Sequence, residues 1–82
     1  MKQKSLTRDE LFLVKLFEIG DSSGDPFQKI DRYVVGQAVG QNDRSVDNIV
    51  RMLAQANFIK KGEGDSIYLT KNGDSLIKSL HC

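Results

Sequence analysis

Histidine and cysteine, two residue types often used in nucleophilic catalysis, are scarce in this chain of 82 residues, and they stand at one end of it. His81 and Cys82 are its only histidine and its only cysteine. A cysteine–histidine nucleophile needs a third group that orients the histidine, together with a fixed pocket. A chain end is the place where order is usually lost. We therefore expect no catalytic pair here and do not expect an enzyme.

Metal and phosphate chemistry find no better support in the sequence. A zinc site needs about four ligands at suitable spacing, and the chain has no such set. Gly62-Glu63-Gly64 lacks the remaining positions of a phosphate loop, whose pattern is Gly-x-x-x-x-Gly-Lys-Ser/Thr. The sequence therefore predicts no metal, no cofactor and no evident small-molecule ligand.

The composition is that of an ordinary globular chain, with 28% charged and 39% hydrophobic residues. Its length predicts one domain over residues 1–82. The net charge is +1, because 12 lysines and arginines stand against 11 acidic residues. Dedicated nucleic-acid binders are usually more basic. A nucleic-acid-binding role would therefore depend on clustering of the basic residues on one face.

The sequence predicts a cytoplasmic location. A lone cysteine cannot form an intramolecular disulfide, which fits a reducing compartment. No apolar run approaches the ~20 residues of a membrane span, so we expect no membrane partner. The apolar stretch near the N-terminus follows the charged residues Arg8-Asp9-Glu10 and precedes no small-residue cleavage site, which argues against a signal peptide.

The first helix is predicted to begin at Thr7-Arg8-Asp9-Glu10, a capping box in which Thr7 and Glu10 satisfy each other's backbone amides. Gly20 is its predicted end. Between these residues only Lys15 and Glu18 are polar in the stretch 11–19. That apolar arc is wider than a single surface helix needs. Either this helix is the central core helix, or its spare face packs against a second subunit.

The later elements are marked by caps and periodicity. The second helix starts either at Pro26, capped by Asp25, or near Lys29 after a short extended segment, and it ends at Gly40. Asn42 or Asp43 caps the third helix, which ends at Asn57. Residues 58–61 and 66–69 are predicted strands joined by a Gly-rich loop, and Thr70 caps a final helix. The expected core comprises Val35, Val39, Val46, Ile49, Val50, Leu53, Phe58 and Leu69.

The resulting order is helix, helix, helix, strand, strand, helix, an α+β arrangement. It resembles the winged helix-turn-helix family of small prokaryotic-type transcriptional regulators, in which a three-helix core carries a two-stranded hairpin, the wing, and a C-terminal helix. Gly36 stands where the first helix of the motif must be small, four residues before Gly40, which begins the turn. Leu69-Thr70-x-x-Gly73 resembles the junction between wing and last helix. Gln41 differs from the apolar residue often found after the turn glycine.

The resemblance implies that the third helix lies in the major groove of double-stranded DNA. Arg51 would pair with guanine and Asn48 with adenine, and Arg44 or Ser45 would hold phosphate. Asp47 would accept from cytosine, although it stands awkwardly near phosphates. The outward residues implied in DNA binding are Arg44, Ser45, Asp47, Asn48, Arg51 and Gln55. An ordinary solvated helix face is the competing interpretation.

The predicted hairpin would approach the sugar-phosphate backbone through Lys60 and Lys61. Glu63 and Asp65 at its tip would repel phosphate, so the tip is expected to stay off the DNA. A polar hairpin that only completes the fold is the alternative.

The favoured interpretation is a sequence-specific DNA-binding transcription regulator, acting as a homodimer through its first and last helices. One copy of so small and weakly charged a domain would bind DNA poorly. The alternative is a winged helix that packs on another protein and does not bind DNA, which the near-neutral charge favours.

Overall fold

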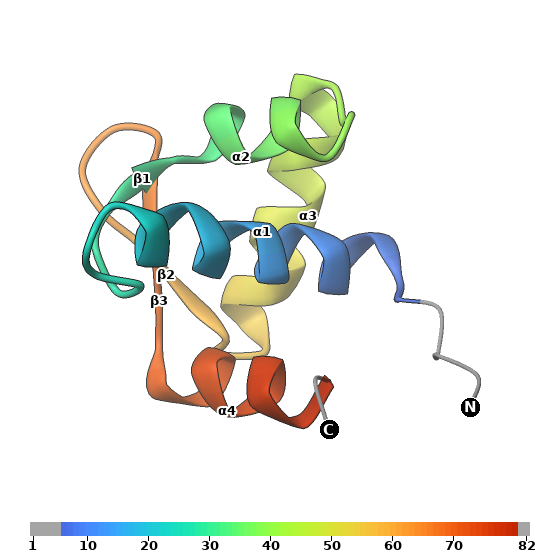
Figure 1. Ribbon diagram of the computed structural model, residues 1–82. Helices are drawn as coiled ribbons and strands as arrows, with labels where there is room; N and C mark the ends of the chain where they lie inside the picture. The colour runs from blue at the N-terminus through green and yellow to red at the C-terminus, as the bar shows by residue number, and fades with distance from the viewer. Residues whose placement is uncertain (1–5, 81–82) are drawn as a thin grey trace.

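Four helices and a three-stranded antiparallel sheet make up the computed structural model, which describes residues 6–80 (Figure 1). The fold is thus a small α+β domain, as the sequence predicted at that level. The elements are α1 Arg8–Ser22, β1 Ile30–Asp31, α2 Arg32–Ala38, α3 Asp43–Gln55, β2 Ile59–Lys61, β3 Ser66–Leu69 and α4 Lys71–Leu80. His81 and Cys82, the pair considered for catalysis, lie outside the described residues. No helix in the described range is long and apolar enough to cross a membrane.

The start of α1 is as predicted, but its end is not. The Glu10 amide donates to Thr7 Oγ1 at 3.1 Å, and the Thr7 amide donates to Glu10 Oε1 at 2.9 Å. The helix continues past Gly20 to Ser22, so the predicted stop at Gly20 is wrong. Gly20 is buried, and a β-carbon there would lie 2.8 Å from the Asp25 carbonyl oxygen. The glycine therefore admits the returning chain and does not end the helix.

The sheet has a third strand that the sequence did not reveal. Ile30 pairs with Ile67 of β3, which gives the strand order β1-β3-β2, so the prediction of a two-stranded hairpin alone is wrong. Asp31 then caps α2 by accepting from the Tyr33 amide at 2.8 Å. The second helix therefore begins at Arg32 after an extended segment, and Asp25 caps only a turn through the Phe27 amide.

Helices α2 and α3 approach closely at one point. A β-carbon on Gly36 would overlap the Cγ2 methyl of Val46, so only glycine fits there without rearrangement. Gly40 has φ 74°, and the Gln41 amide donates to the Gly36 carbonyl at 2.9 Å, which closes the turn. Asn42 then caps α3 by accepting from the Ser45 amide at 2.9 Å. The small contact residue and the turn glycine thus have the roles predicted for them.

The hairpin is fastened to α3 and α4 at its base. Asn57 has φ 64°, the left-handed conformation predicted for it, and β2 follows two residues later. Thr70 Oγ1 accepts from the Gly73 amide at 3.1 Å and donates to the Asn57 carbonyl at 2.6 Å. The predicted cap of α4 is therefore confirmed, and it also fixes where α3 ends relative to α4.

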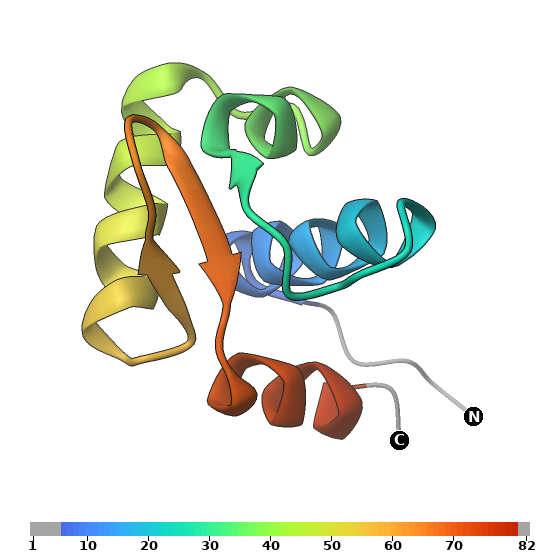
Figure 2. The same ribbon diagram turned by 90° about the vertical axis from the view of Figure 1, so that its left-hand side faces the viewer.

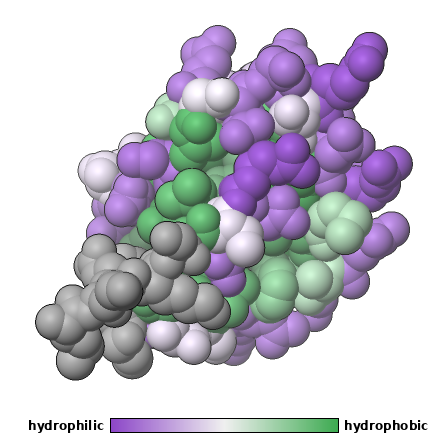
Figure 3. Space-filling model, turned by 90° about the vertical axis from the view of Figure 1, so that its right-hand side faces the viewer, coloured by the Kyte–Doolittle hydropathy of each residue, from purple (hydrophilic) through white to green (hydrophobic). Residues whose placement is uncertain are grey.

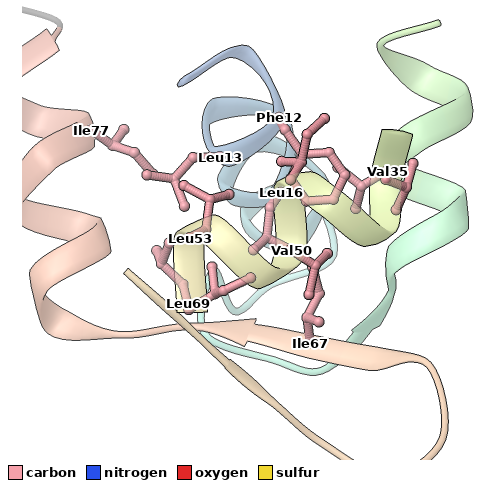
Figure 4. Packing of buried hydrophobic residues seen from close by; sticks show 12 residues of the cluster. Phe12, Leu13, Leu16, Val35, Val50, Leu53, Ile67, Leu69 and Ile77 are labelled. Carbon is pink, nitrogen blue, oxygen red and sulfur yellow. The ribbon is translucent and has the colours of Figure 1, made fainter. Parts of the chain in front are cut away.

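The core lies between α1 and the layer formed by α3 and the sheet (Figures 2 and 4). Of the eight predicted core residues six are buried, while Val39 and Phe58 are half-buried against the core. The buried apolar side chains are Phe12, Leu13, Leu16, Val35, Val46, Ile49, Val50, Leu53, Ile59, Ile67, Leu69 and Ile77. Three of them belong to α1, which is therefore the central helix of the core. Leu11 on the opposite side of α1 remains 48% exposed.

The contact of Gly36 with Val46 yields a stability prediction. Gly36→Ala should destabilise the fold, because overpacking costs about 1–3 kcal/mol and exceeds the roughly 0.5–1 kcal/mol that alanine gains in a helix. Urea unfolding measures the difference. Gln37→Ala, at an exposed position of the same helix, is the matched control and should not destabilise.

Val46→Ala removes the methyl that the new β-carbon would meet. It should therefore cost less in the Gly36→Ala background than in the natural chain. If the changes in the free energy of unfolding caused by Gly36→Ala and Val46→Ala were strictly additive, they would contradict the close contact.

Candidate nucleic-acid interface

One face of α3 is polar, exposed and free of the core. Arg44, Asn48, Arg51 and Gln55 are all exposed and recur at helical spacing, so they form one stripe. The buried face of the same helix carries Val46, Ile49, Val50 and Leu53. Because 3.6 residues make a turn, the two sets point in opposite directions. The stripe is available to a partner without disturbing the fold.

The first turn of α3 offers backbone donors near this stripe. Ser45 is half-buried, and its amide is already engaged by the Asn42 side chain. Its hydroxyl stands on the flank of the helix rather than at the centre of the stripe. A helix N-terminus attracts anions through its free amides and its dipole, and Arg44 adds a full positive charge there.

Asn48 and Arg51 are linked to each other. Arg51 Nη2 lies 3.0 Å from Asn48 Oδ1, and a guanidinium can only donate, so the oxygen of the amide is the atom that accepts. The pair then presents only donors outward, namely the Asn48 amino group and the remaining guanidinium N–H groups. Guanine offers two acceptors in the major groove, whereas bidentate pairing of asparagine with adenine needs that oxygen free. As arranged, the pair suits acceptors on a base edge.

Asp47 is turned toward the protein rather than along the stripe. Its Oδ1 accepts from the Tyr33 hydroxyl at 2.8 Å and lies 3.6 Å from Arg32 Nη1. The hydrogen bond to Asp47, assisted by desolvation and by the negative charges of Asp47 and Asp65, raises the pKa of Tyr33 to about 12. Asp47, whose negative charge was expected to be unfavourable near phosphates, is thus paired with residues of α2.

The two lysines of the hairpin lie on the edge strand β2, and both are exposed. Figure 2 shows β2 on the α3 side of the sheet, with α1 on the other side, and β2 packs against α3. Lys60 stands opposite Tyr68 of β3. At the tip, Glu63 Oε1 lies 3.9 Å from Lys29 Nζ, which partly offsets its charge.

The structure brings four of the residues singled out in the sequence together, because Arg44, Asn48, Arg51 and Gln55 share one stripe, while Ser45 and Asp47 stand on the flanks of α3. Lys60 and Lys61 lie on β2, which packs against α3, and as consecutive strand residues they point to opposite faces of the sheet. Arg32 and Tyr33 were missed, because neither periodicity nor a motif marks a side chain that reaches another helix. No protein-family model matches the chain, and no curated protein sequence matches it.

The bond between Tyr33 and Asp47 predicts an unusual titration. The phenol should lose its proton with a midpoint near pH 12, against about 10 for an ordinary tyrosine. Ultraviolet absorbance follows the ionisation, and Tyr33→Phe identifies the transition by removing it. Because the folded pKa is raised, the stabilisation from this bond is complete below pH ~10 and is lost as the pH rises through about 12.

Asp47→Asn keeps an acceptor oxygen but removes the charge. The midpoint should therefore fall toward the ordinary value. A midpoint near 10 in the natural chain would contradict the contact.

Proposed function

We propose that this chain is a winged helix-turn-helix domain that binds double-stranded DNA and regulates transcription. In this proposal α3 enters the major groove and the β2–β3 hairpin lies near the sugar-phosphate backbone. The observation that carries the proposal is the exposed stripe Arg44, Asn48, Arg51 and Gln55 on α3. It is supported by the close packing of α2 on α3 at Gly36 and by the lysines on the adjacent strand.

The residues divide into two roles by their chemistry. Arg51 and Asn48, linked as donors, suit a guanine and a neighbouring acceptor on the base edges. Arg44, with the first turn of α3, suits a phosphate, and so do Lys60 and Lys61. Gln55 lies at the far end of the stripe, where it offers both a donor and an acceptor.

We further propose that two copies act together. The net charge of +1 gives one copy little attraction for a duplex, and a second copy doubles the contacts. Figure 3 shows apolar side chains gathered among polar ones on the side of the molecule where α1 begins and α4 ends. Leu11 of α1 is exposed, and Leu76 and Leu80 of α4 are half-buried. A dimer through α1 and α4 would cover such side chains.

The second candidate function is that of a protein-interaction module without DNA binding. Met52 favours it, because this large apolar side chain is 54% exposed on α3 itself. Val34 is similarly exposed on α2. A partner protein could cover both side chains, whereas a major groove gains little from them.

Substitutions of base-reading residues and of phosphate-holding residues should affect DNA binding in different ways. Arg51→Ala should weaken binding to a preferred duplex by about 1–3 kcal/mol and relax preference at one base pair. Lys60→Ala and Lys61→Ala should weaken all duplexes alike, each lowering the salt dependence of log K by about one unit. Selection from a random duplex pool, followed by titration at several salt concentrations, measures both effects.

Lys15→Ala is the matched control, because Lys15 lies on α1, away from α3, and pairs with Glu18 at 2.9 Å. It should change neither quantity. Absence of any duplex binding tighter than ~100 µM at physiological salt, the weak end of non-specific affinities, would favour the protein-interaction module instead.

A further inference from the structure

Three side chains join parts of the proposed interface that are distant in sequence. Arg32 and Tyr33 open α2, and Asp47 lies in the second turn of α3. Together with the backbone carbonyl of Asp65, at the end of the hairpin loop, they form what we call the Arg32 cluster. Figure 1 shows the start of α2 standing between the hairpin loop and α3. The cluster spans that interval.

Arg32 contacts the hairpin loop through its backbone amide and Nε, and α3 through Nη1. Its backbone amide and its Nε both donate to the Asp65 carbonyl at 3.1 Å. Its Nη1 lies 3.6 Å from Asp47 Oδ1, the same oxygen that accepts from the Tyr33 hydroxyl. The Arg32 side chain is only 11% exposed and that of Asp47 is 54% exposed, so this ion pair is shielded from solvent only on the Arg32 side.

The hairpin loop is itself fastened to the point that Arg32 holds. The Gly62 amide donates to the Ser66 carbonyl at 2.8 Å, and Ser66 Oγ donates to the Glu63 carbonyl at 2.7 Å. Ser66, the residue after Asp65, is thereby bonded to Gly62 and Glu63, which directly follow β2. The contact of Arg32 with the Asp65 carbonyl is therefore close to the end of the strand that carries Lys60 and Lys61.

The hairpin does not depend on this cluster for its folding. Ile59, Ile67 and Leu69 are buried, and the Thr70 hydroxyl fastens its base to Asn57. The upper part of β3 also pairs with β1, which ends one residue before Arg32, so the hairpin and the start of α2 form one unit. What Asp47 adds, through Arg32 and Tyr33, is a connection between that unit and α3 near the hairpin loop. Without it the strands would remain paired, while this unit could change its direction relative to α3.

We propose that Arg32, Tyr33 and Asp47 are positioning residues, which fix the hairpin against α3 so that base-reading and phosphate-holding side chains meet one duplex together. This inference rests on the proposed DNA-binding function. In it Asp47 contacts no base, because its carboxylate is engaged within the chain. Its charge serves the alignment of the two DNA-contacting parts.

The test is a mutant cycle between the cluster and the hairpin lysines. Asp47→Ala breaks the cluster at its most exposed member, whose side chain is 54% exposed. It is combined with the double substitution Lys60→Ala, Lys61→Ala, and the salt dependence of duplex binding is measured by fluorescence anisotropy. In the natural background the two lysine substitutions should lower the salt slope by about two units together. In the Asp47→Ala background they should lower it by less than half as much.

Asp43→Ala is the matched control for loss of a negative charge. Asp43 lies in the first turn of the same helix, and its side chain has no hydrogen bond or ion pair with any residue from 6 to 80. In that background the lysines should retain their full effect. Urea unfolding shows that each variant is folded at the temperature used, and Tyr33→Phe replaces Asp47→Ala if the latter is not.

The outcomes separate the inference from the function on which it rests. A full lysine effect in both the Asp47→Ala and the Asp43→Ala backgrounds would overturn the positioning role while leaving DNA binding intact. Equal gains in affinity for the two aspartate variants would do the same, because Asp47 would then act only as a repulsive charge. Failure of the natural chain to bind any duplex would overturn the proposed function and this inference with it.

Discussion

The approach of α2 to α3 at Gly36 is the constraint on which the arrangement depends. Because Val46 occupies the space that a β-carbon would need, the two helices meet backbone to side chain. That contact sets the turn at Gly40 and fixes which residues of α3 face inward. It also brings Tyr33, at the start of α2, within reach of Asp47 on α3. The polar stripe on α3 is thus a consequence of how α2 is seated.

The net charge of +1 does not show where the charged side chains lie relative to α3 and β2. Asp47 is paired with Arg32 and Tyr33, and Glu18 with Lys15 on the far side of the core. The exposed stripe of α3 carries Arg44 and Arg51 and no acidic residue, and the adjacent strand carries two lysines. Asp47 is thus engaged within the chain, whereas Asp43, exposed beside Arg44 in the first turn of α3, has no side-chain partner among residues 6–80. The acidic residues at the hairpin tip remain the part least suited to a polyanion.

Local signals in the sequence predicted most of the elements and their ends. Thr7, Asn57 and Thr70 could be read as caps because capping involves residues a few positions apart. The α3 stripe followed from periodicity in the same way. Strand β1 could not be found, because two residues are too few for an alternating pattern and its pairing depends on β3, far along the chain. The Arg32 cluster was missed because its contacts also join residues that are far apart in the sequence. Gly20 was wrongly predicted to end α1, because glycine is favoured both at helix ends and at positions of close packing.

The most direct test of the central claim is a map of the DNA-contacting surface. Amide resonances of the labelled protein are followed by NMR while a duplex is added at low salt. If α3 and β2 contact DNA, we expect shifts concentrated at Arg44, Asn48, Arg51 and Gln55 and at the two lysines of β2, with none on the outer face of α1 around Lys15. Shifts confined to α1 and α4, or no shifts at all, would contradict that contact.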